Sequence, residues 1–513
     1  MQLLHKPISL VLAALVAVGF LVQSSDTTQA LGRLERSGYG SGSSMLTVAY
    51  DFSLTTGDPD KTGQPADMGL LVNIFDPLTQ RGPNGKLKPS LAESWHLINK
   101  FTWRFKLRKG VTFQDGEPFN ASVVKYSIDR VLDPAFASPV QELHDVKAVK
   151  VVSKYVVDIV TQTPDPLVPS KVALFGGMMV PPKYITQKGE TYFASHPVGT
   201  GPYKLTSWVH DDHLTLEAYA HYWESKPHVK QITVRFITDP TTRVSAVLSG
   251  QVDLATAIPP TSAQAVRSNG LRLDRSPGLR IYYISIANNT GPLSKLKVRQ
   301  ALSYAVNTQL LIKKLLLGYG QPIAAPVAQT NYGSHVPLKP YPYSLAKARK
   351  LLATAGYKDG FTVTFDTQTG VYQTMAQVVA QMWSKVGVHA TVDVLPATEY
   401  VDKYTKGTLG PVWNLGYTIW QGDPTTLIQT FFHSAAPRAR YFSPSLDQEI
   451  NHMASQNTQK KRLKLMYGIL TQLHDATPWI YLVQANDLYG VAKRVHWTVP
   501  AGEFLRFDTV SIR

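Results

Sequence analysis

Apolar and polar side chains alternate strictly from Phe101 to Arg108, in the run FTWRFKLR. The aromatic and leucine side chains fall on one side of an extended chain, and the threonine, arginine and lysine side chains fall on the other. This period of two predicts a β-strand with one buried face. Shorter stretches of the same kind predict further strands at residues 45–50, 148–152, 155–161, 214–218 and 231–236.

A longer period marks the helices. From Gln373 to Val386 the apolar side chains recur every three or four positions, so they share one face of an amphipathic helix. Gly387 fits the C-cap of this helix, and an alternating strand follows over residues 390–394. A second amphipathic helix is expected over residues 460–475. Because strands and helices interleave along the chain, the sequence predicts an α/β fold.

The N-terminus has the pattern of an export signal. Lys6 supplies a positive charge, a mainly apolar run follows from Ile8 to Val22, and small and polar residues come next. This order is typical of a cleaved secretory signal peptide. The apolar run of about 15 residues is shorter than the roughly 20 that a membrane-spanning helix needs. We therefore expect a signal peptide over residues 1–30 and a flexible Gly- and Ser-rich leader over residues 31–44.

Composition narrows the class of protein. The chain of 513 residues is 44% apolar, enough for two or three well-packed lobes, and it contains no cysteine. It therefore has neither disulfides nor the cysteine of a bacterial lipoprotein, and we expect a soluble, freely diffusing periplasmic protein. The net charge is +16, but the basic residues are scattered and the densest short cluster is Lys460–Arg462. We interpret them as a solvated basic surface, suited to an acidic environment, and expect no nucleic-acid partner.

The motifs after this leader resemble those of a known family. Residues 89–130 read PSLAESWHLINKFTWRFKLRKGVTFQDGEPFNASVVKYSIDR, which closely resembles the signature of family 5 of the substrate-binding proteins of ABC importers, the peptide/nickel class. The resemblance runs from about residue 45 to 510. Its other motifs are GTGPY at Gly199–Tyr203, DPTTR at Asp239–Arg243, VRQAL at Val298–Leu302 and GDP at Gly422–Pro424.

This resemblance implies a type II periplasmic-binding-protein clamshell, with two lobes and an additional domain. Domain I would be discontinuous, and the proposed division is domain I at residues 45–82, 197–278 and 486–513, domain II at 83–196 and domain III at 279–485. The ligand would lie between domains I and III, and hinge closure would trap it. A monomer that delivers its ligand to the transmembrane permease of an ABC importer, without a cofactor or a metal, is the implied function.

The resemblance also points to a ligand-binding segment, Asn414–Pro424. In peptide-binding members the corresponding strand lies beside the ligand backbone, and an Asp four residues before the proline pairs with the ligand ammonium. A gapless match places Trp420 there, and the nearest acid is Asp423. The arginine that dipeptide binders use is absent from Phe365–Gly370. We therefore expect a longer or modified peptide, or another small organic solute, in preference to a free dipeptide.

Aromatic and polar side chains in and near this segment are the candidate ligand contacts, since aromatic residues line much of such clefts. For the aromatic candidates other than Trp420, packing in the protein core is the alternative interpretation. The candidates are Trp420, Tyr417, Thr418, Asp423, Trp413, Tyr282 and Tyr283.

Other functions stay open from the sequence. A binder of a nickel chelate, an opine or a sugar-like solute would belong to the same family, and His433 lies near the candidate segment. The pattern His210–His213 has side chains that could hold a metal, but a solvated turn is the favoured interpretation. An enzyme is not expected, because the chain lacks a GxSxG elbow, an HExxH motif, a Walker loop and any cysteine, and Asp115 and Glu117 lie in a turn motif. A ligand-sensing or chaperone function also remains possible.

Overall fold

The protein was analysed as a computed structural model that describes residues 44–82, 86–328, 331, 337–419, 423–500 and 504–513. Residues 44–513 form one compact unit. The predicted signal peptide and nearly all of the predicted leader lie outside the described residues. Within the described ranges, no helix has both the length and the apolar character that crossing a membrane requires.

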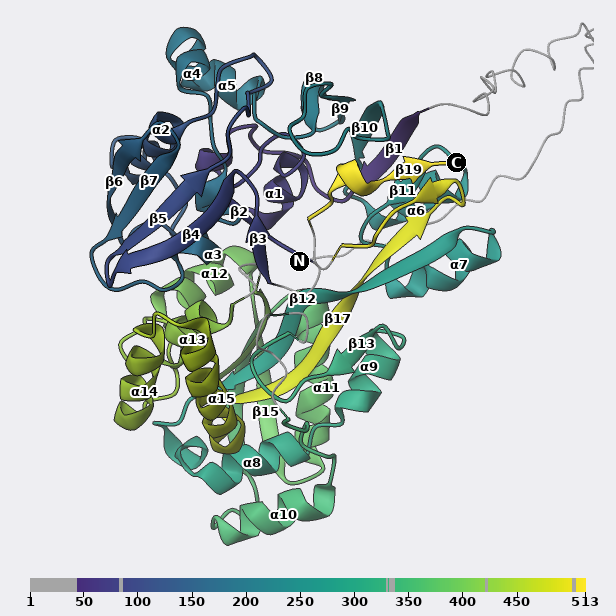
Figure 1. The fold of residues 1–513 in the computed structure, drawn as a ribbon. Helices are drawn as coiled ribbons and strands as arrows, with labels where there is room; N and C mark the ends of the chain where they lie inside the picture. Colours follow the sequence, from purple (N-terminus) through teal and green to yellow (C-terminus); the bar gives the residue numbers. More distant parts are fainter. Residues whose placement is uncertain (1–43, 83–85, 329–330, 332–336, 420–422, 501–503) are drawn as a thin grey trace, which may run out of the picture. The chain divides into compact units, whose positions relative to one another are not determined.

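A mixed sheet of 11 strands is the largest element of the described chain (Figure 1). Its strands, in order across the sheet, are β15 (Val388–Leu395), β14 (Phe361–Gln368), β16 (Val412–Thr418), β12 (Arg272–Ile286), β17 (Trp479–Val491), β11 (Leu254–Ala255), β1 (Met45–Tyr50), β10 (Gln231–Phe236), β9 (His213–Ala218) and β8 (Tyr203–Val209), and β13 (Gly320–Pro322) pairs with β17 outside this path.

The long strands β12 and β17 connect the two ends of this sheet (Figure 1). They pair antiparallel from Arg272 opposite Val491 to Ser285 opposite Trp479, and the register shifts between Pro277 and Ile281. Gly278 lies in this interruption, where an added Cβ would be 2.8 Å from the carbonyl oxygen of Ala485. The proposed boundaries between domains I and III, at 278/279 and 485/486, fall at the same interruption.

Residues of the proposed domain II form a separate four-stranded sheet. Its antiparallel strands lie in the order β4 (Ala92–Asn99), β5 (Thr102–Leu107), β7 (Val156–Thr161) and β6 (Val146–Ser153). Strands β2 (Thr79–Arg81) and β3 (Leu87–Pro89) form a small hairpin beside it. Phe105 and Leu107 are fully buried, as the alternation FTWRFKLR predicts, and they join the core that this sheet shares with β1, β9 and β10.

Helices pack on the large sheet and on the four-stranded sheet. Those before β12 are η1 (Pro59–Lys61), α1 (Pro65–Leu71), α2 (Ala121–Leu132), α3 (Val168–Lys171), η2 (Phe175–Gly177), α4 (Pro182–Lys188), α5 (Glu190–Ser195), α6 (Pro240–Leu248), η3 (Pro260–Ser262) and α7 (Ala263–Ser268).

The proposed domain III is mostly helical around β12, β14, β15 and β16. Its helices are η4 (Gly291–Ser294), α8 (Leu296–Tyr304), α9 (Thr308–Leu315), α10 (Leu345–Thr354), α11 (Val371–Ser384), α12 (Ala397–Lys406), α13 (Thr425–Phe432), α14 (Pro444–Ala454) and α15 (Gln459–Ala476). After β17 the chain returns to the proposed domain I with β18 (Val495–His496), η5 (Phe507–Thr509) and β19 (Ser511–Ile512). Two apolar cores lie on the two faces of these strands, one containing Trp383 and the other containing Trp479.

The predicted elements are confirmed. Strands β1 and β10 have the bounds predicted from alternation, and β5, β6, β7, β9 and β15 differ by a few residues at their ends. The predicted helices correspond to α11 and α15. The mixed α/β class is confirmed as well, because strands and helices interleave throughout the described chain.

Candidate ligand-binding site

The candidate segment begins as strand β16, which lies between two other strands. β16 pairs antiparallel with β12, with Thr418 opposite Arg280 and Tyr417 opposite Ile281. It pairs in parallel with β14, where Asp366 lies opposite Trp413. Neighbours on both sides hold the backbone in place, so the strand presents its side chains from a fixed frame.

Two of the predicted contact residues pack in the core. The rings of Tyr283 and Trp479 stack with centroids 3.5 Å apart, and Trp413 meets Tyr283 edge to face at 5.8 Å. The exposed fractions of Tyr283 and Trp413 are 0% and 1%. Both side chains therefore pack in the protein core under β16. Core packing is the alternative interpretation that the sequence left open for them.

Tyr282 and Thr418 are half-buried. The ring of Tyr282 lies 5.9 Å from that of Tyr372, and both rings approach β16 at Gly416. A Cβ at Gly416 would lie 3.1 Å from the Tyr372 hydroxyl and 3.2 Å from the Tyr282 ring. Glycine at this position therefore lets two phenol side chains lie directly against the strand.

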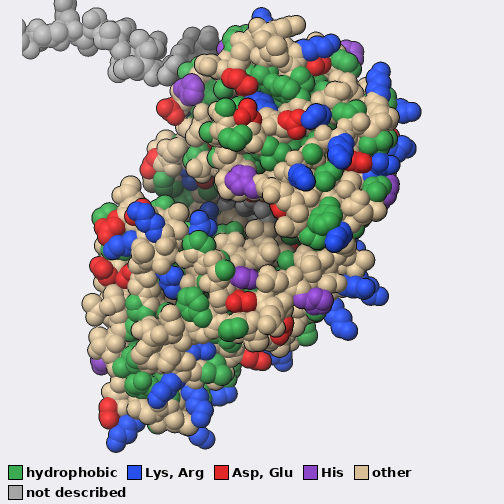
Figure 2. All heavy atoms as spheres, turned by 90° about the vertical axis from the view of Figure 1, so that its left-hand side faces the viewer, with side chains coloured by type: hydrophobic (Ala, Val, Ile, Leu, Met, Phe, Trp, Pro, Cys, Tyr) green, Lys and Arg blue, Asp and Glu red, His purple; other side chains and the backbone are tan. Residues whose placement is uncertain are grey.

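Tyr417 lines a cavity with a volume of about 710 Å³. We refer to it as the II–III cavity, because its walls come from residues 141–145 and 163–171 of the proposed domain II and from Tyr417, Thr425–Gln429, Arg438 and Asn451–Ser455 of the proposed domain III. Figure 2 shows a face of the molecule that is hollowed between an upper and a lower part. The sequence placed the ligand between domains I and III, whereas domain II supplies the second wall of this cavity.

A smaller cavity of about 100 Å³ lies on the domain I side. Its walls include Asp51 just after β1 and Asp487 on β17. Asp51 accepts a hydrogen bond from the Thr256 hydroxyl at 2.7 Å. Asp487 pairs with Ser276 and lies next to Gly278, which falls in the interruption of the β12–β17 ladder. This cavity therefore adjoins the crossing between the proposed domains I and III.

Asp423 is a buried carboxylate with partners of its own. It pairs with Arg462 at 2.9 Å and accepts a hydrogen bond from the backbone N–H of Thr425 at 3.0 Å, so it joins the start of α13 to α15. Arg81 from β2 interacts electrostatically with Asp423 and Arg462, and burial lowers the pKa of Arg81 to about 10. Asp423 is therefore paired with one guanidinium group and interacts electrostatically with a second.

The flanks of the segment are fixed on both sides. The Asn331 amide donates to the carbonyl oxygen of Ile419 at 3.1 Å, and Asp423 is held by Arg462. Trp420, the residue that the gapless match placed at the ammonium-binding position, lies outside the described residues, as do Gln421 and Gly422.

The segment before α11, in which dipeptide binders have an arginine, connects to β16. Asp366 accepts from the backbone N–H of Gly410 at 2.7 Å, and the Thr367 hydroxyl donates to the Asn414 side chain at 2.7 Å. The Asn414 amide donates in turn to the carbonyl oxygen of Tyr372 at 2.8 Å. These polar side chains fix β14 against β16 and are not free for a ligand carboxylate.

Sequence reasoning did not identify Arg438, Thr425 and Glu142 as residues of the cavity wall. Arg438 lies in the connection between α13 and α14, and Glu142 lies in the connection before β6, where no periodic pattern or motif marks them. Thr425 directly follows the GDP motif, and this position in the chain is the only sequence signal that points to it as a wall residue.

The predicted turn motifs are turns in the structure. His210–His213 connects β8 to β9, with Asp211 at a φ of 58°, and the His213 ring bonds to Asp212 at 2.7 Å. Glu117 accepts from the backbone N–H of Lys183 at 3.1 Å, beside the bridge between Thr112 and Pro118. Across the part of the chain that the structure describes, no group of three or more His, Cys, Asp or Glu side chains is placed to hold a metal ion.

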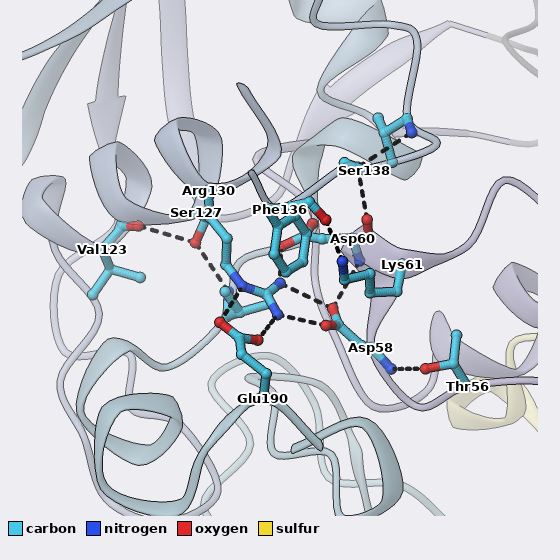
Figure 3. Close-up of polar contacts among 12 residues, drawn as sticks. Thr56, Asp58, Asp60, Lys61, Val123, Ser127, Arg130, Phe136, Ser138 and Glu190 are labelled. Atoms are coloured by element: carbon cyan, nitrogen blue, oxygen red, sulfur yellow. Dashed lines mark hydrogen bonds and ion pairs between the residues drawn. The ribbon is translucent and has the colours of Figure 1, made fainter. Parts of the chain in front are cut away.

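A largely buried ionic cluster lies near η1 (Figure 3). Arg130 from α2 pairs with Asp58 at 2.5 Å, with Asp60 at 2.7 Å and with Glu190 from α5. The guanidinium stacks on the Phe136 ring at 4.0 Å. Burial and the adjacent Asp58 carboxylate raise the pKa of Asp60. Every donor of Arg130 has a partner, so the cluster joins α2, α5 and η1 and leaves no group free for a ligand.

Comparison with known proteins agrees with this architecture. The sequence model described as "Bacterial extracellular solute-binding proteins, family 5 Middle" matches residues 86–438, which is more than half of the chain. The glutathione-binding protein GsiB of Pectobacterium atrosepticum is 30% identical over 464 residues, covering 87% of this chain and 90% of that protein. GsiB of Salmonella typhimurium is 28% identical and covers 91% of this chain and 94% of its own.

Solved structures show the same fold. HbpA2 from Haemophilus parasuis aligns with a TM-score of 0.83 at 22% identity, covering 91% of this chain and 100% of its own. The periplasmic binding protein DppA from Helicobacter pylori, in complex with the peptide STSA, aligns with a TM-score of 0.75 at 23% identity, covering 91% of this chain and 98% of its own. The predicted type II periplasmic-binding-protein fold is thereby confirmed.

Proposed function

The chain belongs to family 5 of the bacterial extracellular solute-binding proteins, and from this premise we propose that it captures a peptide or peptide-like small solute for an ABC importer. The observation that carries the proposal is the II–III cavity of about 710 Å³, which adjoins β16. Its volume lies within the range of about 300–1,000 Å³ that is usual for small-ligand sites.

The relatives support the peptide class of solute. The chain covers most of the length of GsiB, a protein that binds glutathione, and glutathione is a tripeptide with a modified linkage. A modified peptide also agrees with the absence of an arginine from Phe365–Gly370 and of an aspartate at position 420. A buried ligand ammonium without a charged partner would be costly, so a free dipeptide is a poor match for this segment.

We assign the candidate residues to different roles. Tyr417 lines the II–III cavity and is proposed to contact the ligand, together with Trp420. Thr418 and Tyr282 are half-buried but do not line this cavity, because they belong to the other face of β16. Tyr283 and Trp413 support β16 from the core. Asp423 is proposed to hold the start of α13 through Arg462, and so to act on the ligand through the segment that it positions.

The proposed division into three domains explains how the solute would be bound, enclosed and delivered. We propose that the protein works in the periplasm as a monomer, binds its solute without catalysis, and closes at the β12–β17 crossing. A ligand stabilises the closed form only to the extent that it binds that form better than the open one. The permease of the importer would then recognise the closed form.

The experiment that tests this function is identification of the natural ligand by mass spectrometry of the native protein, followed by calorimetry with a panel of solutes. The panel contains glutathione, tripeptides, dipeptides, an opine, a sugar and the nickel–histidine complex. We expect micromolar or tighter binding of at least one peptide or peptide derivative. Exclusive binding of the nickel complex, the opine or the sugar would refute the peptide class, and turnover of a bound solute would refute a purely binding function.

A further inference from the structure

The II–III cavity has one cation without an ionic partner. Arg438 is half-buried in the cavity wall, and its guanidinium lies 4.7 Å from the centre of the Tyr404 ring. Among the described residues, no carboxylate lies within ion-pair distance of it. Its neighbour Arg440 differs, because its guanidinium donates to the carbonyl oxygens of Gly407 and Ala439 and is used in the fold.

The acids on the opposite wall are mostly engaged within domain II. Asp165 pairs with Lys171 at 2.6 Å and accepts from the backbone N–H of Leu167 at 2.8 Å. Asp145 accepts from the Thr163 hydroxyl at 2.8 Å. Since these contacts satisfy the two carboxylates where they are, neither of them crosses the cavity to neutralise Arg438.

Tyr417 lies between the charges of the two walls. Burial raises the pKa of the Tyr417 phenol, the positive charge of Arg438 opposes this effect, and the negative charge of Glu142 adds to it. Arg438 belongs to domain III and Glu142 to domain II. A positive side chain of one wall and a negative side chain of the other thus both act electrostatically on one candidate ligand contact.

The start of α13 adds to the positive character of the domain III wall. Thr425 and Thr426, the first two residues of this eight-residue helix, line the cavity. The hydroxyl of Thr425 is fully buried and has no hydrogen-bond partner in the described structure. Asp423, which accepts a hydrogen bond from the backbone N–H of Thr425, is already neutralised by Arg462, so it does not cancel the positive end of the helix dipole.

We propose that the II–III cavity receives the free carboxylate end of the solute, with Arg438 as the residue that pairs with it. This inference rests on the proposed function and names the group of the ligand that the cavity selects. A planar guanidinium held against a tyrosine ring is suited to two parallel hydrogen bonds with a carboxylate. Because the walls belong to domains II and III, a ligand held there also couples these two domains.

The test uses two matched pairs of probes and isothermal titration calorimetry. One pair is glutathione and its C-terminal glycinamide, and the other is trialanine and trialanine amide, so that each pair differs by one negative charge. For any pair that binds, the wild-type protein should bind the carboxylate form about tenfold or more tightly than the amide. In Arg438→Gln the two forms should bind within about threefold of each other.

The matched control is Arg267→Gln. Arg267 on α7 also lies over a tyrosine ring, 5.7 Å from the centre of Tyr319, but it is outside the cavity wall. It should keep the wild-type preference for the carboxylate form. Melting temperatures of both variants report whether the fold is intact, and if Arg438→Gln does not fold, Arg438→Lys should bind the carboxylate form more weakly than wild type while keeping part of the preference.

The outcomes separate the inference from the function on which it rests. If wild type binds a probe pair and Arg438→Gln or Arg438→Lys keeps the full wild-type preference, Arg438 is not the carboxylate partner and the inference is wrong. If wild type binds acid and amide equally, the cavity does not select a carboxylate and the inference is also wrong. If wild type binds neither pair and binds only the nickel–histidine complex, the opine or the sugar, the peptide class itself is refuted.

Discussion

Asp423, a candidate ligand contact from the sequence, has its partners within the fold. The sequence made it a candidate contact because it was the nearest acid to position 420. The structure pairs it with Arg462, and the side chains of the two residues are 4% and 5% exposed. A buried pair of this kind contributes little net stability as a pair, but removal of one member leaves an unpaired charge in the interior.

Asp423→Asn should therefore destabilise the protein by about 3–5 kcal/mol. Urea unfolding at neutral pH measures the change. The control is Asp402→Asn, which breaks the exposed pair between Asp402 and Lys406 on α12 and should cost less than about 1 kcal/mol. Equal effects of the two substitutions would show that the Asp423–Arg462 pair is not the buried link between α13 and α15.

Two buried carboxyl groups make the stability depend on pH. Burial raises the pKa of Asp76 to about 6, although the charge of Arg506 and hydrogen bonds from Trp223 and Tyr222 act in the other direction. The pKa of Asp60 is raised as well, by burial and by Asp58. In the unfolded chain both groups titrate near the ordinary aspartate pKa of about 3.9. The folded protein thus retains protons that the unfolded chain has already released.

The contribution of these two groups to the unfolding free energy should accordingly be complete below about pH 4 and fall as the pH rises through 6, because proton release then favours the unfolded chain. For Asp76 alone the loss is on the order of 3 kcal/mol. Urea unfolding at pH 4.5, 5.5 and 6.5 measures it, and Asp76→Asn should flatten the slope. An unchanged slope in this variant would contradict the assignment to Asp76. The predicted trend agrees with an acidic environment, which the net charge of +16 also favours.

At the scale of elements, the parallel pair β14–β15 depends on a close approach of two glycines. Gly360 precedes β14 with a φ of +81°, and a Cβ there would lie 1.7 Å from the carbonyl oxygen of Gly387. Gly387 lies two residues beyond Lys385, the C-cap of α11, so the C-cap that the sequence assigned to Gly387 is wrong. The start of the pair, Phe361 opposite Val388, follows directly.

Gly360→Ala should destabilise the protein by more than about 2 kcal/mol, since both the backbone conformation and the steric clash oppose a side chain. Gly370→Ala is the matched control, because Gly370 has a φ of +82° but no atom near an added Cβ, and it should cost about 1 kcal/mol. Thermal unfolding compares them. If both variants lose the same stability, steric contact with Gly387 is not what requires glycine at position 360.

At the scale of the whole molecule, the chain between the cores is the place where closure can occur. Strands β12 and β17 connect the two ends of the large sheet. The register of their antiparallel pairing shifts only between Pro277 and Ile281 and between Tyr282 and Tyr283. A crossing made of two strands allows the packed cores on either side to move as bodies, with the change in backbone angles confined to a few residues. The scattered basic side chains in Figure 2 lie on both sides of the hollow.

Saturation with the solute identified by mass spectrometry should lower the radius of gyration in small-angle X-ray scattering and raise the melting temperature. The decrease follows from closure around the ligand, and the increase follows from mass action on the folded state. A panel solute without calorimetric binding serves as control. Ligand-induced stabilisation without any decrease in the radius would show that the protein binds without closing.

The sequence by itself determined the local structure and the family. Alternation and helical periodicity gave the elements because one buried face leaves a repeating pattern in a strand or helix. The motifs indicated the family and its fold, because turns such as GTGPY and Asp115–Glu117 mark places where the backbone must bend and where glycine or aspartate is favoured.

Only the tertiary structure decided which polar side chains are free. Asp423 and Asp366 are used within the fold, while Arg438 reaches a cavity wall from a connection without any motif. The reason is physical: a charge is available to a ligand only if no other part of the chain neutralises it. Its possible partners are distant in sequence, as Arg462 is from Asp423, and no local pattern encodes them.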